Sequence, residues 1–344
     1  MRRPLLKAGV AGAAAAASAA AGVVTTASVQ RRRARRRWKS ADESERLGSL
    51  RGDPSTVVAD DGVPLYVEVD EPDDADPSRP TLVFVHGWML NLDCWHLQRL
   101  AFRPTHRMVF YDQRCHGRSG RAEATGCTVV QLAHDLARVI ETVAPEGPIV
   151  LIGHSMGGMS IMEYAKEHAD VMHERVLGLA LIGTSAGDLG RVLPGKPGEF
   201  LKDRSSMVFA LGARAPRLIG AGRRLTSGPT FWFTRRFAFG GEVPPEYAAF
   251  TDAMISSSDA SVLWDFWPLF VGLDEYASLA AFEGIPTLVI VGSHDALTPV
   301  RHAYRISELV PESRVVVIEG AGHMVMLENA DEVTKLLLEL VGSA

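Results

Sequence analysis

The sequence predicts an α/β fold in which a doubly wound, mostly parallel β-sheet carries helices on both faces. Short, nearly continuous apolar runs recur along the chain, and stretches with the 3.6-residue period of amphipathic helices separate them. One long stretch interrupts this alternation and is expected to form a helical insertion. Apolar residues make up 47% of the 344 residues, which is sufficient for a sizeable core.

The elements follow one another from about residue 55. Thr56–Ala59 and Leu65–Val69 flank the turn sequence Asp60-Asp61-Gly62 and are predicted to pair as a hairpin. Six apolar runs are then predicted to be strands buried on both faces: Thr81–Val85, Met108–Tyr111, Ile149–Ile152, Leu177–Ile182, Leu288–Val291 and Val315–Ile318. Helices are predicted over Thr128–Val143, Met156–Glu167, Val300–Leu309 and Ala330–Val341.

The stretch from about Ala186 to Glu283 contains no clear strand. A structureless loop of this length is implausible in a compact domain, so we expect a helical cap over one end of the sheet. Because 15 of the 25 aromatic residues fall here, we expect most to pack the cap's own core and a minority to line a pocket mouth. The predicted folded domain spans residues 42–344, with the cap at about 186–283.

Residues 1–41 form a separate N-terminal segment that holds ten Lys or Arg and no acidic residue. Ala8–Val29 is uncharged and, at 22 residues, long enough to span a bilayer, although it is rich in alanine and glycine. The basic residues that follow it favour a membrane anchor with the catalytic domain in the cytoplasm. Membrane contact would then run through residues 1–39, whose basic side chains suit anionic headgroups.

Two other interpretations of this segment stay open. Arg2-Arg3-Pro4-Leu5-Leu6-Lys7 resembles a twin-arginine export signal, and Thr25-Thr26-Ala27 is an acceptable cleavage site. Such cleavage would leave an unusual, strongly basic N-terminus. The segment could also be a disordered extension or an acid-poor organelle transit peptide.

Several classes of partner are excluded or disfavoured by composition. Beyond residue 41 the chain holds 26 basic against 41 acidic residues, and an acidic body repels nucleic acid. The odd number of cysteines, Cys94, Cys115 and Cys127, suggests packing residues or free thiols instead of a disulfide framework. With no phosphate loop, dinucleotide fingerprint or zinc-spaced histidine pair, we expect no cofactor and no metal.

A catalytic serine is predicted at Ser155. The strand Ile149–Ile152 runs directly into Gly153-His154-Ser155-Met156-Gly157, and a helical pattern follows. This G-x-S-x-G sequence between a buried strand and a helix is typical of a nucleophile elbow, in which the serine lies on a sharp turn. The glycines allow the strand and helix to approach closely.

A serine hydroxyl needs a base that a third group orients, and the order expected downstream is acid, then histidine. Asp295 follows the strand Leu288–Val291, and His323 lies in the loop after the last strand. Since ligands bind at the carboxyl ends of parallel strands, the three side chains are expected to converge there. Asp188 is the reserve candidate for the acid.

Two backbone N–H groups are expected to form the oxyanion hole. One belongs to Met156, at the N-terminus of a helix, and the other to Trp88, in the loop after Thr81–Val85. His86 is expected to brace that loop, and His154 is expected to be structural.

Five motifs along the chain belong together: His86-Gly87-Trp88, Asp112-Gln113-Arg114-Cys115-His116-Gly117-Arg118-Ser119, the elbow, Ser293-His294-Asp295 and Gly322-His323. In this combination the sequence resembles the α/β-hydrolase family over residues 55–342. The resemblance implies the α/β-hydrolase fold with a cap over the active site, and a structural turn at residues 112–119. The elbow is similar to those of carboxylesterases, monoacylglycerol lipases and cofactor-free haloperoxidase-like enzymes.

The expected function is therefore hydrolysis of a small carboxylic ester with an apolar acyl chain, through an acyl-enzyme on Ser155. A thioesterase or amidase with the same triad is one alternative, favoured by ten basic against three acidic residues over 186–236. A haloperoxidase-like perhydrolase is another. A non-catalytic ligand receptor on the same fold is the alternative from a different class, which the intact triad disfavours.

Overall fold

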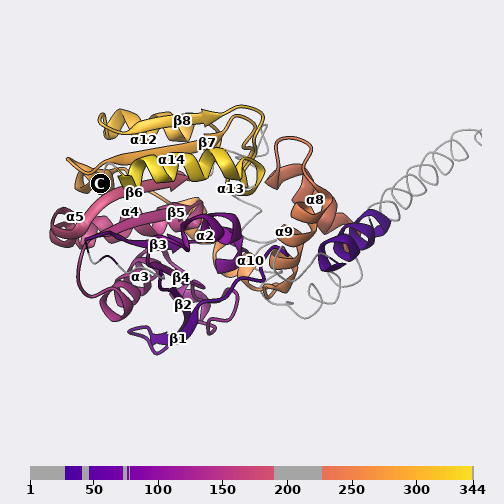
Figure 1. Cartoon of the computed structure of the whole chain (residues 1–344), viewed down its shortest axis with the longest axis horizontal. Coiled ribbons are helices and arrows are strands. Elements are labelled where there is room, and N and C mark those ends of the chain that lie inside the picture. Colours follow the sequence, from indigo (N-terminus) through magenta and orange to yellow (C-terminus); the bar gives the residue numbers. More distant parts are fainter. Residues whose placement is uncertain (1–27, 41–45, 73–75, 77, 190–226, 343–344) are drawn as a thin grey trace, which may run out of the picture.

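The computed structural model describes residues 28–40, 46–72, 76, 78–189 and 227–342. An eight-stranded sheet forms its centre (Figure 1). Across the sheet the strands are β1 (Asp53–Val58), β2 (Pro64–Asp70), β4 (Met108–Tyr111), β3 (Thr81–Val85), β5 (Ile149–His154), β6 (Val176–Ile182), β7 (Thr287–Gly292) and β8 (Arg314–Ile318). Strands β1 and β2 pair antiparallel, as do β2 and β4, and the other neighbours pair parallel. The prediction of a mostly parallel sheet is confirmed.

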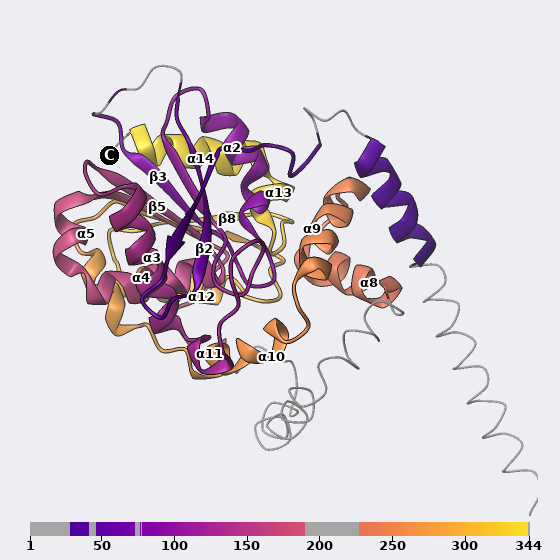
Figure 2. The ribbon, with the colours of Figure 1, turned by 90° about the horizontal axis from the view of Figure 1, so that it is seen from below.

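Helices cover both faces of the sheet (Figure 2). One face carries α2 (His96–Phe102), α13 (Val325–Glu328) and α14 (Ala330–Gly342). The other carries α3 (Val129–Val143), α4 (Met156–Glu167), α5 (Ala169–Arg175) and α12 (Arg301–Leu309). Successive residues of β3 alternate between the two hydrophobic clusters, with Leu82 and Phe84 in one and Val83 and Val85 in the other. This alternation explains why the central strands are continuously apolar.

The described residues between β6 and β7 are mainly helical. They form α8 (Ser227–Ala238), α9 (Pro245–Ser257), α10 (Val262–Asp265), α11 (Trp267–Gly272) and the 3₁₀-helix η4 (Ala277–Phe282). Helices α8 and α9 lie beside the carboxyl ends of the strands, whereas η4 packs against α4 and α12 on the sheet face (Figure 2). The rest of the predicted cap, residues 190–226, lies outside the described residues.

The end of the basic N-terminal segment is a helix, residues 28–40, that packs against α9 (Figures 1 and 2). Arg31 Nε donates a 2.7 Å hydrogen bond to the buried carboxylate of Asp252. The Trp38 ring lies 5.7 Å from the Phe250 ring, and its Nε1 donates to the carbonyl of Leu47 at 3.1 Å. The sequence gives no sign of this contact, because its partners lie more than 200 residues apart.

The predicted membrane span, Ala8–Val29, lies almost entirely outside the described residues. Among the helices that the structure does describe, none is both long enough and apolar enough to cross a bilayer.

Replacing Arg31 with alanine is expected to destabilise the protein by about 1–3 kcal/mol, because the buried Asp252 carboxylate loses a charged hydrogen-bond donor. Urea unfolding measures this. The matched control is Arg32→Ala, since Arg32 is exposed on the same helix and its loss should change stability by less than about 0.5 kcal/mol. Equal effects of the two substitutions would contradict the docking of this helix on α9.

A pair of buried carboxyl groups lies where η4 meets α4. Glu275 and Glu163 are almost completely buried, and Lys166 Nζ lies 2.8 Å from Glu163 Oε2. Burial and the hydrogen bond with Glu163 raise the pKa of Glu275 to about 7. The folded protein therefore binds a proton more tightly than the unfolded chain. Stability from this group is fully present below the ordinary glutamate pKa and is lost as the pH rises to about 7.

Glu275→Gln is accordingly expected to raise the free energy of unfolding by about 1–2 kcal/mol at pH 8 and to change it little at pH 4.5. The glutamine amide retains a hydrogen-bond donor for Glu163. Urea unfolding at the two pH values measures the difference. A variant less stable than the parent at pH 8 would show that the ionised Glu275 carboxylate stabilises the fold, contrary to this prediction.

Candidate active site

Ser155 lies on the turn between β5 and α4, with φ 52° and ψ −118°. This left-handed backbone conformation is rare for a residue with a side chain and is typical of strained functional turns. Two hydrogen bonds fix the turn: Ser155 N–H donates to the carbonyl of Ile182 at 2.9 Å, and Thr184 Oγ1 donates to the carbonyl of Ser155 at 2.7 Å. Both partners come from the end of β6, so the sheet itself holds the serine backbone.

His323 and Asp295 form a hydrogen-bonded pair at the same edge of the sheet. The distance from His323 Nδ1 to Asp295 Oδ2 is 2.9 Å, and both residues are buried. A carboxylate can only accept, so Nδ1 carries the proton and Nε2 keeps its lone pair. The remaining Asp295 oxygen accepts the N–H groups of Leu297 and Thr298 at 2.8 and 2.9 Å.

These contacts keep Asp295 ionised. Burial on its own raises the pKa of this carboxyl, but the charge and hydrogen bond of His323 and the donors of Thr298 outweigh it and lower the pKa to about 2. The hydroxyl of Thr298 also donates to Asp295 Oδ2 at 2.8 Å. A negative charge therefore lies behind His323 at neutral pH.

His154 connects the elbow to the His323 loop. Its ring lies 4.7 Å from the His323 ring, and its Nε2–H donates to the His323 carbonyl at 3.0 Å. Burial, followed by the proximity of His323, lowers the pKa of His154 to about 3, so this ring is neutral. The residue directly before Ser155 thus packs on His323 without adding a competing charge.

The loop that follows β3 passes close to the serine. A Cβ at Gly87 would lie 2.8 Å from His154 Nδ1 and 3.1 Å from Ser155 Cβ, so a side chain there would displace the elbow. Trp88 comes next, with its indole Nε1 donating to the carbonyl of Val262 at 3.2 Å and its ring 4.9 Å from that of Phe270. Met156 is the first residue of α4, where a backbone N–H has no acceptor within the helix.

His86 braces this loop, as expected from the sequence. Its Nε2 accepts the Gln113 N–H at 2.9 Å and its Nδ1–H donates to the Gly87 carbonyl at 2.7 Å, which together specify one neutral tautomer. Burial and the neighbouring His116 lower the pKa of His86 well below its ordinary value. His86 therefore acts as a structural strut between the loop after β3 and the loop after β4.

The reserve acid, Asp188, lies elsewhere. Its Oδ2 accepts the hydroxyl of Tyr276 at 3.2 Å, whereas the acid that the structure places on His323 is Asp295. Sequence analysis missed Thr298 and Thr184, which hold Asp295 and Ser155. A threonine three residues after Asp295 is a usable signal, because a side-chain carboxylate commonly accepts backbone N–H groups two and three positions on.

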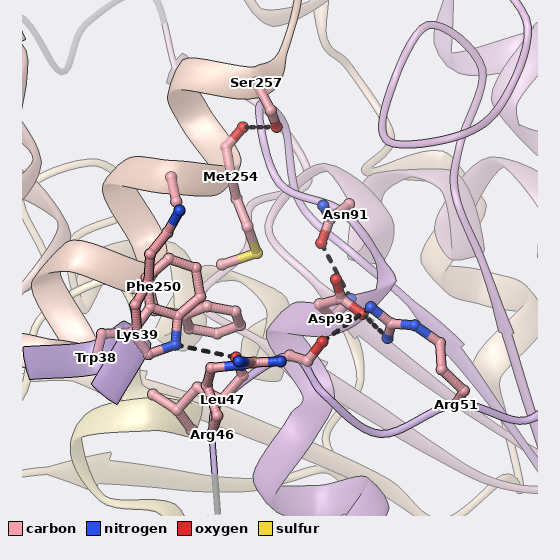
Figure 3. A pocket seen from close by; sticks show the side chains of 12 residues that line it. Trp38, Lys39, Arg46, Leu47, Arg51, Asn91, Asp93, Phe250, Met254 and Ser257 are labelled. Carbon is pink, nitrogen blue, oxygen red and sulfur yellow. Dashed lines mark hydrogen bonds and ion pairs between the residues drawn. The ribbon is translucent and has the colours of Figure 1, made fainter. Parts of the chain in front are cut away.

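A pocket of about 550 Å³ opens where the N-terminal helix, η1 (Leu92–Trp95) and α9 meet (Figure 3). Trp38, Phe250 and Met254 form part of its wall, and Arg51 Nη1 lies 2.7 Å from Asp93 Oδ1 beside them. The described residues that line it do not include the predicted catalytic side chains. This pocket therefore belongs to the docking region of the N-terminal helix.

Comparison with known proteins shows the family of this chain. The family model described as the alpha/beta hydrolase fold matches residues 80–330. The chain belongs to the α/β-hydrolase family. Among relatives in this family, a bifunctional esterase/perhydrolase of Acinetobacter calcoaceticus is 26% identical over 289 residues, covering 83% of this chain and 99% of its own. A non-heme haloperoxidase of Rhodococcus erythropolis is also 26% identical, with the same coverage of both chains.

Solved α/β-hydrolase structures align over most of the chain. A bromoperoxidase from Bacillus anthracis gives a TM-score of 0.67 at 22% identity, and an esterase from Exiguobacterium antarcticum gives 0.66 at 21%. Each alignment covers 84% of this chain and 100% of the other. At these identities the likeness concerns the fold alone.

Proposed function

We propose that this protein is a serine hydrolase that cleaves a carboxylic ester through an acyl-enzyme on Ser155, with His323 as base and Asp295 as its partner. The observation that supports it most directly is the buried His323–Asp295 pair at the strand edge where Ser155 occupies a strained turn. Esterases and haloperoxidases among the relatives support the same reaction class.

The proposed reaction has two halves, in which Ser155 is first acylated and then deacylated. His323 Nε2 takes the Ser155 proton while Oγ attacks the ester carbonyl, and the N–H groups of Met156 and Trp88 receive the oxyanion. The C–O bond to the alcohol breaks as His323 returns the proton to the leaving oxygen. Water, deprotonated by His323, then cleaves the acyl-enzyme, releases the acid and restores Ser155.

An apolar acyl chain is the substrate feature that the surroundings favour. Met89, Met156 and Met159 cluster with Phe266 and Leu269 from the cap helices. Flexible methionine side chains adapt to ligands of different shape, and aromatic residues provide apolar contact area. The proposal is therefore an ester with a short or medium apolar acyl group, entering between the elbow and α10–α11.

Perhydrolysis is the second candidate, and the names of two relatives, an esterase/perhydrolase and a non-heme haloperoxidase, favour it. The acyl-enzyme would be the same. Hydrogen peroxide would replace water as the attacking nucleophile, forming a peracid while His323 takes the peroxide proton. The two reactions differ only in the second half, so the same residues serve both.

Labelling with a fluorophosphonate tests the serine directly. We expect stoichiometric labelling of Ser155 in the full chain, and turnover of p-nitrophenyl esters from acetate upward with an optimum at short to medium chain length. Adding hydrogen peroxide distinguishes perhydrolysis by the formation of peracid. A labelled enzyme that hydrolyses no ester would exclude the ester proposal and direct attention to thioesters and amides. Failure of a folded protein to label at all would favour a non-catalytic receptor.

A further inference from the structure

The two cysteines Cys115 and Cys127 lie in contact behind the predicted oxyanion loop. Their sulfur atoms are 3.9 Å apart, although the residues are 12 positions apart in the sequence and come from different loops. Both thiols are buried, in one hydrophobic cluster with Met89 and Met156. The sequence predicts packing residues or free thiols here, and nothing in the sequence pattern indicates that these two thiols meet.

We propose that Cys115 and Cys127 are a reversible thiol–disulfide pair, oxidised by a hydroperoxide to an intramolecular disulfide. The sulfur atoms need to close from 3.9 Å to about 2.05 Å for the bond to form. Cys115 occupies a left-handed backbone conformation, with φ 66°, in the loop after β4. Cys127 directly follows the short 3₁₀-helix η2 (Ala124–Gly126).

The environment assigns different roles to the two thiols. The hydrogen bond with Cys127, aided by a backbone hydrogen bond and the charges of Arg121 and Arg114, lowers the pKa of Cys115 to about 7. The same contact and burial raise the pKa of Cys127. The Ala122 N–H also donates to Cys115 Sγ at 3.2 Å, which favours Cys115 as the thiolate that reacts first and Cys127 as the thiol that resolves the product.

The proposed reaction balances with one hydroperoxide. The Cys115 thiolate attacks the terminal peroxide oxygen, which forms a sulfenic acid and releases the other oxygen as water or an alcohol. The Cys127 sulfur then attacks the sulfenic sulfur and displaces its hydroxyl group as water. Two electrons and two thiol hydrogens pass to the peroxide in total, and a dithiol reductant reverses the bond.

A disulfide between Cys115 and Cys127 would be connected to the predicted active site by hydrogen bonds of the loop that contains Cys115. The loop that contains Cys115 also supplies Gln113, whose N–H donates to His86, and His86 holds the carbonyl of Gly87. Arg114 already ties the loop to α3 through a 2.6 Å contact with Asp135. A disulfide would add a covalent brace behind the loop that carries Trp88 and would narrow its motion.

Peptide mapping of the full chain tests the proposal. The protein is reduced, titrated with hydrogen peroxide, alkylated and digested without reductant. We expect a cross-linked peptide joining Cys115 to Cys127, loss of two of the three free thiols, and recovery of both on adding dithiothreitol. Cys94 is the internal control, because it lies in a different hydrophobic cluster from Cys115 and Cys127 and should remain alkylatable after unfolding.

Thermal unfolding tests the brace. The oxidised protein should melt about 3–8 °C above the reduced protein, and Cys127→Ser or Cys115→Ser should abolish the difference. Sulfinic or sulfonic acid on Cys115 without any cross-link would overturn the thiol pair. A cross-link that leaves the midpoint of thermal unfolding unchanged, or lowers it, would contradict the proposal that the disulfide stabilises this region. Neither readout depends on ester hydrolysis, so both outcomes stand apart from the proposed function.

Discussion

Ser155→Ala is expected to lower kcat/KM for p-nitrophenyl acetate by about 10⁴-fold or more. Removing the hydroxyl removes the proposed nucleophile, and the proposed base His323 then has no serine proton to accept. The residual rate would come from direct attack of water on the ester, with the oxyanion stabilised by the predicted backbone donors. The fold should be unaffected, because the turn is held by backbone atoms of Ser155.

The matched control is Ser313→Ala, since Ser313 lies in a turn before β8 and its hydroxyl donates only to the nearby Val310 carbonyl among the described contacts. Steady-state kinetics and urea unfolding on both variants separate catalysis from stability. Full activity in Ser155→Ala would refute the assignment of the nucleophile.

Asp295→Asn is expected to lower kcat by about 10³–10⁴-fold with little change in KM. An amide at this position presents an N–H group to His323 Nδ1, so the imidazole proton moves to Nε2, where the base must be unprotonated. The variant also lacks the carboxylate charge that would stabilise the imidazolium formed during attack. Fluorophosphonate labelling of Ser155 should slow in parallel.

Asp188→Asn is the control for this prediction, because Asp188 bonds Tyr276 instead of His323. Its kinetics should match those of the parent protein. Since the pKa of Asp295 is about 2, loss of activity from protonating this group is confined to strongly acidic solution. A large effect of Asp188→Asn with a small one of Asp295→Asn would reverse the assignment of the acid.

The sheet could be predicted almost residue by residue. Thr81–Val85 and Met108–Tyr111 match β3 and β4, since a strand buried on both faces must be apolar throughout and its ends are marked by polar or glycine residues. Helix α4 likewise begins and ends where its amphipathic pattern does. Local pattern therefore specifies the elements that make the core.

Contacts between distant residues could not be predicted in this way. Arg99 is buried against Glu68 and Asp70, and Arg114 against Asp135, yet each appears in the sequence as an ordinary charged residue. Burying a charge is favourable only when its partner is placed by the whole fold, and no period in the sequence encodes that partner. The meeting of Cys115 with Cys127 escaped prediction for the same reason.

The candidate site falls between these cases. Asp295 and His323 could be located because strand ends in a parallel sheet share one edge, and the structure places them 2.9 Å apart. The contacts of the Thr298 hydroxyl and of the tilted His154 ring could be seen only in the structure. The sequence thus predicts that Asp295 and His323 meet at this edge, whereas the groups that orient them depend on local turns and packing.

The docking of helix 28–40 on α9 has a consequence for biosynthesis. Arg31 precedes Asp252 by 221 residues, so at about 5–20 residues per second the ribosome delivers the partner roughly 10–45 s after the arginine. Throughout that interval the α9-facing side of the basic helix has no α9 to pack against. Its attachment to α9 therefore cannot precede synthesis of residues 245–257, which lie more than 200 residues further along the chain.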